Sequence, residues 1–140
     1  MSPVFAKECT NPSIFKYFYN IWIKGRPFIL DEDLEVRGDN YKSFINNLDG
    51  KFSIFIEKNN NCFICATDFF GCGPVFWSKF NENIIFSTHL GLLLRNYQSK
   101  IKYDDKGLIS YLAGMISLQG ETPYQNIYRL TSTKLLKAEI

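Results

Sequence analysis

The stretch ATDFFGCGPVFW, Ala66 to Trp77, places an aspartate, two glycines and a proline between large apolar side chains. Loops at a protein surface are usually more polar. Glycine is favoured where the backbone takes a positive φ, and an aspartate side chain accepts hydrogen bonds from nearby backbone N–H groups. We therefore predict a tight structural turn built on Asp68, Gly71, Gly73 and Pro74, with aromatic residues of the core on either side.

The segments around this turn alternate apolar and polar residues, which is typical of strands. Residues 48–67 predict a hairpin that turns at Asn59–Asn61, because asparagine tolerates left-handed backbone angles. Residues 74–89 predict a second hairpin that turns at Asn81–Asn83. Residues 17–30 predict one bent strand or two strands near a sheet edge, where the proline of a Gly-Arg-Pro break is tolerated.

Three helices are expected, over residues 41–48, 87–97 and 104–115, and Asp104 or Asp105 would cap the third. The apolar face of the third helix consists of four residues that share helical spacing: Leu108, Ile109, Leu112 and Met115. Strands, a helix, two hairpins, two helices and final strands follow one another along the chain. This order predicts an α+β fold with a mostly antiparallel sheet.

Length and composition favour one globular domain over residues 1–140, with 46% hydrophobic and 21% charged residues. The formal net charge is +2, and charges of both signs are mixed along the chain. This pattern argues against nucleic-acid binding, which usually requires a basic stripe. The sequence has no apolar run of the ~18 residues that a membrane helix needs. The first residues also lack the layout of a signal peptide, so we expect a cytoplasmic protein.

Four cysteines are present, at positions 9, 62, 65 and 72, and two of them form a Cys-x-x-Cys pattern. Such a pattern often binds zinc or performs redox chemistry. Here Cys62 and Cys65 fall in a predicted strand, where residues three apart point to opposite faces of the sheet. We therefore predict free thiols and no metal site.

Several segments, taken in order, resemble the N-terminal glutaminase domain of the asparagine synthetase family. Leu48–Ile54 resembles the family's L-N/D-G-x-F-A-F segment, and Ala66–Trp77 resembles its A-R-D-R-F-G-I-K-P-L-Y-Y segment. Phe86–Leu93 is similar to F-A-S-E-I-K-A-L. Gly120–Tyr124 and Ile127–Leu130 are similar to the last strands of that domain.

The resemblance implies an N-terminal-nucleophile hydrolase fold, here a shortened αββα sandwich with mostly antiparallel sheets. Such domains hydrolyse glutamine with an N-terminal cysteine whose free α-amine acts as the base. An Asn-Gly pair forms the oxyanion hole, and an arginine and an aspartate hold the glutamine. Two candidates for the nucleophile are Ser2, exposed at the terminus by removal of Met1, and Cys9, which requires cleavage after Glu8.

Much of the family's active site has no counterpart in this sequence. The strand that should carry Asn-Gly-Glu corresponds to residues 21–27, where Lys24 stands near the asparagine position. The H-R-G-P-D and S-D-T-E segments are missing, and so is the S-G-G-x-D-S pyrophosphate loop of the ATP-dependent domain. The chain therefore resembles the degenerate N-terminal domains of lasso-peptide cyclases and β-lactam synthetases, which take no ammonia from glutamine.

We therefore predict a single non-hydrolytic glutaminase-like domain with no catalytic, metal-binding or cofactor-binding residue of its own, and with no ATP-dependent synthetase domain in the chain. Its expected partner is a separate ATP-dependent synthetase domain or subunit, which alone would bind ATP and magnesium. Self-association is a further expectation. The surface expected to meet a partner lies in the C-terminal segment: Ile127, Tyr128, Leu130, Leu135 and Leu136.

Two other functions remain open. If Ser2 or a processed Cys9 is a working nucleophile, the chain is a glutaminase subunit that supplies ammonia for asparagine or other amide synthesis. Alternatively, the strand Lys51–Phe55 stacks bases, as sheet-based RNA-binding modules do. The mixed charges disfavour the second alternative.

Overall fold

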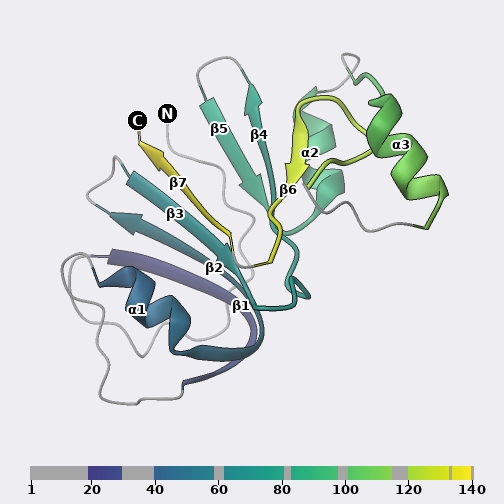
Figure 1. Ribbon diagram of the computed structural model, residues 1–140. Coiled ribbons are helices and arrows are strands. Elements are labelled where there is room, and N and C mark those ends of the chain that lie inside the picture. The colour runs from purple at the N-terminus through teal and green to yellow at the C-terminus, as the bar shows by residue number, and fades with distance from the viewer. Residues whose placement is uncertain are drawn as a thin grey trace. The chain divides into compact units, whose positions relative to one another are not determined.

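The computed structural model describes residues 19–29, 40–58, 62–80, 83–97, 101–114, 120–132 and 134–139. These residues form two compact units. The first unit contains the described residues up to 73 and from 132 onward, and the second contains those from 74 to 131. Each unit combines an antiparallel sheet with a small amount of helix, which is compatible with the predicted α+β class (Figure 1).

A four-stranded antiparallel sheet forms the first unit. Its strands are β1 (Tyr19–Ile29), β2 (Leu48–Lys58), β3 (Cys62–Thr67) and β7 (Leu135–Glu139), in the spatial order β1-β2-β3-β7. Of the two alternatives predicted for the first segment, the single strand is confirmed, and β1 lies at the edge of the described sheet. The predicted turn at Asn59–Asn61 lies outside the described residues.

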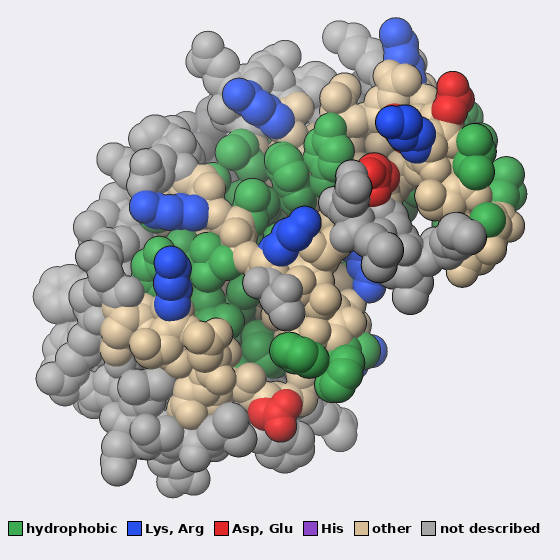
Figure 2. Space-filling model, in the orientation of Figure 1, with side chains coloured by type: hydrophobic (Ala, Val, Ile, Leu, Met, Phe, Trp, Pro, Cys, Tyr) green, Lys and Arg blue, Asp and Glu red, His purple; other side chains and the backbone are tan. Residues whose placement is uncertain are grey.

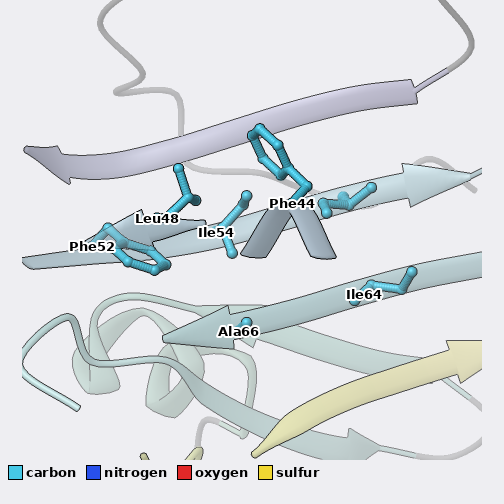
Figure 3. Packing of buried hydrophobic residues seen from close by; sticks show 7 residues of the cluster. Phe44, Leu48, Phe52, Ile54, Ile64 and Ala66 are labelled. Atoms are coloured by element: carbon cyan, nitrogen blue, oxygen red, sulfur yellow. The ribbon is translucent and has the colours of Figure 1, made fainter. Parts of the chain in front are cut away.

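Helix α1 (Tyr41–Asn46) packs against one face of this sheet. Its Phe44 is 1% exposed and lies in one hydrophobic cluster with Ile54 of β2 and Ile64 of β3 (Figure 3). The helix is shorter than predicted. Leu48, which the sequence pattern assigned to it, instead begins β2 and pairs with Ile29 of β1.

Part of the opposite face of the four-stranded sheet is also buried, around β3 and Ser53 of β2. Every β3 residue from Phe63 to Thr67 is buried, although successive side chains point to opposite faces. On β2, Ser53 is 1% exposed and lies between Phe52 and Ile54, which are equally buried on the α1 side. The alternation of apolar and polar residues along β2 does not by itself indicate that the Ser53 side is buried.

A three-stranded antiparallel sheet forms the second unit. Its strands are β4 (Phe76–Phe80), β5 (Asn83–Ser87) and β6 (Ile127–Arg129), in the order β5-β4-β6. The second predicted hairpin is therefore confirmed as β4 and β5. Helix α2 (Leu90–Tyr97) packs on this sheet, where Leu93 and Ile127 form a buried cluster.

The last described helix, α3 (Asp105–Leu112), begins with the predicted cap. The side chain of Asp104 accepts a hydrogen bond of 2.8 Å from the N–H of Gly107, as N-cap residues do. Of its predicted apolar face, Ile109 is 67% and Leu112 is 75% exposed, Leu108 is partly buried, and Met115 lies outside the described residues. Hydrophobic side chains accordingly lie at the surface over α3 (Figure 2).

Among the residues that the structure describes, no helix has the length and the apolar character that crossing a membrane requires.

Candidate functional site

The carboxylate of Asp68 organises the turn that follows β3. Asp68 is 1% exposed, and its Oδ1 accepts hydrogen bonds from the N–H of Phe70 (3.1 Å) and of Cys72 (3.0 Å). Its Oδ2 accepts from the N–H of Gly73 (2.6 Å) and of Phe52 on β2 (3.3 Å). Four backbone donors therefore converge on one side chain, an arrangement that satisfies an ionised carboxylate without a cation.

The remaining predicted turn residues lie around this carboxylate. Gly71 takes φ 66°, in the left-handed region, and its N–H donates a 2.9 Å hydrogen bond to the carbonyl of Asp68. The hydroxyl of Thr67 donates to the carbonyl of Gly73. Pro74 follows directly and begins the second unit.

Two opposing effects act on the pKa of Asp68. Burial raises it, whereas the four hydrogen bonds from backbone N–H groups lower it, and the net result is a pKa below the ordinary value. Asp68 is therefore ionised in the folded protein at neutral pH. A carboxylate that is ionised at neutral pH and already accepts four hydrogen bonds suits a structural role better than a general acid or base.

The turn differs from the prediction in the placement of its aromatic residues. Phe69 and Phe70 were expected in the core, but they are 71% and 81% exposed and lie edge to face, with ring centroids 5.2 Å apart. The backbone N–H groups of Phe70, Cys72 and Gly73 point toward the buried Asp68 carboxylate, so the side chains of Phe69 and Phe70 point outward. The prediction of a core position is therefore wrong for both residues.

Lys24 and Gly25 lie on β1, at the position where the sequence comparison expected Asn-Gly. Lys24 is partly buried and its Cα pairs with that of Ser53, while Gly25 pairs with Phe52. Gly25 takes φ 123°, a conformation that disfavours any side chain. Sequence reasoning missed this requirement, although a glycine inside a strand pattern signals close backbone approach.

The two thiols of the Cys-x-x-Cys pattern do not form a binding site. Cys65 is buried, and this burial raises the pKa of its thiol, which keeps it protonated and unreactive. Cys62 is partly buried on β3 and packs against the α1 side of the sheet. Within the described ranges, no three His, Cys, Asp or Glu side chains lie close enough together to hold a metal ion.

The remaining residues that the sequence singled out are the nucleophile candidates, the expected partner surface and the strand residue Phe52. Both nucleophile candidates, Ser2 and Cys9, lie outside the described residues. Of the five residues expected at a partner surface, Ile127 and Leu130 are buried (1% and 4% exposed), Tyr128 is 37% exposed, and Leu135 and Leu136 of β7 are partly buried. Phe52 is only 2% exposed, so it cannot stack bases at the surface of β2.

The chain matches the model of a known protein family. The sequence model described as "Glutamine amidotransferase domain" matches residues 24–139, which include all the elements described above from Lys24 of β1 to Glu139 at the end of β7. No curated protein matches the chain.

Proposed function

Because the chain belongs to the glutamine amidotransferase domain family, we propose that it is a non-hydrolytic member serving an asparagine synthetase-type, amide-forming system. The observation that carries this proposal is Lys24-Gly25 on β1, where an Asn-Gly pair is expected. The glycine of the pair is kept, with the backbone geometry that requires it, and the asparagine is replaced.

This replacement affects transition-state stabilisation directly. An oxyanion hole depends on donors held at hydrogen-bond distance from the place where negative charge develops. A short asparagine side chain fixes its amide close to the backbone, whereas the lysine ammonium lies at the end of a flexible four-carbon stem. The glutaminase chemistry therefore loses a preorganised donor, while the fold that surrounded it is retained.

Burial on both faces of the four-stranded sheet supports an N-terminal-nucleophile hydrolase-like sandwich. In an αββα arrangement each sheet has helices on one face and the other sheet on its second face. Ser53 and Cys65 are each 1% exposed and lie on the face opposite to α1, as an inner face requires. We propose this sandwich as the fold of the complete domain.

The proposed partner is an ATP-dependent synthetase domain or subunit, which would bind ATP and magnesium and form the amide bond. In this arrangement the present domain is a structural partner of the synthetase, and the two are expected to form a stable complex. Self-association of the domain is a second proposal. Both are tested by sedimentation of the chain alone and together with a co-expressed synthetase.

The competing function is an active glutaminase that uses Ser2 or a processed Cys9. The protein is incubated with glutamine, and the glutamate formed is measured. The intact mass is then determined after treatment with an electrophilic glutamine analogue. We expect no glutamate above the buffer control and no covalent adduct. Turnover or an adduct that disappears in Ser2→Ala or Cys9→Ala would establish the active glutaminase instead.

A further inference from the structure

The backbone of Phe52 lies between β1 and the Asp68 turn. Its N–H donates to Oδ2 of Asp68 (3.3 Å), and its carbonyl accepts from the N–H of Asp68 (3.1 Å) and the hydroxyl of Thr67 (3.5 Å). Both polar groups of this peptide backbone therefore point away from β1 and toward the turn.

On its other side, Phe52 pairs with Gly25 of β1. Because the polar groups of Phe52 point toward the turn, this antiparallel pair is of the narrow, non-hydrogen-bonded kind. A Cβ built on Gly25 would lie 2.9 Å from the Cα of Phe52 and would overlap the carbonyl oxygen of Lys51. The backbone of β1 at Gly25 is therefore in close contact with the backbone of β2, and a shift of β2 would move it.

The turn fixes that backbone from the opposite side. A Cβ built on Gly73 would overlap the carbonyl oxygen of Phe52, so the turn also approaches β2 as closely as glycine permits. The backbones of Gly25, Phe52 and Gly73 thus lie side by side in direct contact. Asp68 links the last two, because its carboxylate accepts hydrogen bonds from the N–H groups of Phe52 and Gly73. A displacement of the turn is transmitted through Phe52 to β1.

We propose that Asp68 is a positioning residue for Lys24-Gly25: through the backbone of Phe52, it sets the conformation of the β1 segment that lies at the former substrate site. The proposal relies on the proposed function only for the identity of that segment. The coupling between the turn and β1 follows from the contacts of the first unit alone.

The test compares the backbone amide resonances of Lys24 and Gly25 in uniformly ¹⁵N-labelled protein. The perturbing variant is Asp68→Asn, which keeps the side-chain shape but turns one acceptor oxygen into an NH2 donor. The matched control is Asp49→Asn, because Asp49 is an exposed aspartate of β2 whose Oδ1 accepts only from the N–H of Gly50 among the described hydrogen bonds.

We expect Asp68→Asn to shift the Lys24 and Gly25 resonances, although strand β2 lies between these residues and the turn. The control should change resonances near Gly50 and leave those of Lys24 in place. If Asp68→Asn shifts Phe70 to Gly73 but leaves Lys24 and Gly25 as in the wild type, the positioning role is wrong.

A second variant keeps the proposal testable if Asp68→Asn does not fold. Thr67→Val replaces the hydroxyl, which donates to the carbonyls of Gly73 and Phe52, with a methyl group, and it should shift the Gly25 resonance in the same direction by a smaller amount. An unchanged Gly25 resonance in a folded Thr67→Val protein would contradict the coupling. The measurement uses no glutamine, so its outcome is independent of whether the domain hydrolyses glutamine.

Discussion

Replacing Asp68 with asparagine should lower the free energy of unfolding by about 2–4 kcal/mol, because a buried hydrogen bond to a charged group contributes roughly 1.5–3 kcal/mol. One amide oxygen can keep two of the four donors, and the new NH2 then faces the other two. The less costly orientation keeps the buried donors of Phe52 and Gly73 and turns the NH2 toward Phe70 and Cys72, which lie where the turn is only partly buried.

The assay is chemical denaturation followed by circular dichroism or by tryptophan fluorescence. Asp49→Asn provides the matched control. It also removes a carboxylate with one backbone hydrogen bond, but it lies at an exposed position and should change stability by less than about 0.5 kcal/mol. If Asp68→Asn also changed the free energy of unfolding by less than about 0.5 kcal/mol, the reasoning would be refuted. Such a result would mean that the four N–H groups do not depend on the carboxylate.

The same carboxylate predicts a dependence on pH. The pKa of Asp68 is lower in the folded protein than its ordinary value of 3.8, so the folded state favours the ionised form. Its contribution to stability is therefore complete above the unfolded pKa and is lost as the pH falls through the folded pKa. The difference in unfolding free energy between wild type and Asp68→Asn should be constant above about pH 5 and should shrink below pH 3.8. A difference that stays constant down to pH 2 would contradict the lowered pKa.

Three further predictions follow from burial and packing. Protein purified without added metal should contain substoichiometric zinc, and Cys65→Ser should not change this content; a full equivalent that is lost in the variant would show a metal site. Leu93→Ala should destabilise the protein by about 2–5 kcal/mol because Leu93 is fully buried, whereas Leu112→Lys should have an effect below about 0.5 kcal/mol because Leu112 is 75% exposed; equal shifts of the two denaturation midpoints would show that α3 is packed in solution. Gly91→Ala should stabilise α2 by about 0.5–1 kcal/mol, because a Cβ there meets open space; a lower melting temperature would contradict this placement.

The strands of both hairpins could be predicted from the sequence, because alternation of apolar and polar residues reports strand geometry directly. Phe52, Ile54 and Ile56 share one face of β2, and all three are buried as their spacing indicated. Alternation does not reveal what covers the second face. Ser53 is as well buried as its neighbours, although a serine in an alternating pattern favours the solvent side.

The turn contains features that the sequence predicts and contacts that it does not. Asp68, Gly71 and Gly73 could be singled out because each residue type has a specific backbone use in turns. The hydrogen bond from the N–H of Phe52 to Asp68 connects the turn to β2. It joins residues sixteen positions apart, so no local sequence pattern predicts it. The outward direction of Phe70 has the same origin, since it is fixed by which backbone N–H groups the carboxylate binds.

The prediction of a partner surface failed at Ile127 and Leu130 for a related physical reason. The residue types and the family resemblance indicated an apolar segment at Ile127 and Leu130. Neither specifies whether a partner protein or another element of the same chain covers these side chains. Ile127 packs with Leu93 of α2 and is thereby removed from the surface. Exposed apolar side chains of the second unit include Tyr128 on β6 as well as Ile109 and Leu112 on α3, which follow one another at helical spacing. Periodicity predicted the helix α3, while the exposure of Ile109 and Leu112 could be learned only from the three-dimensional packing of the other elements.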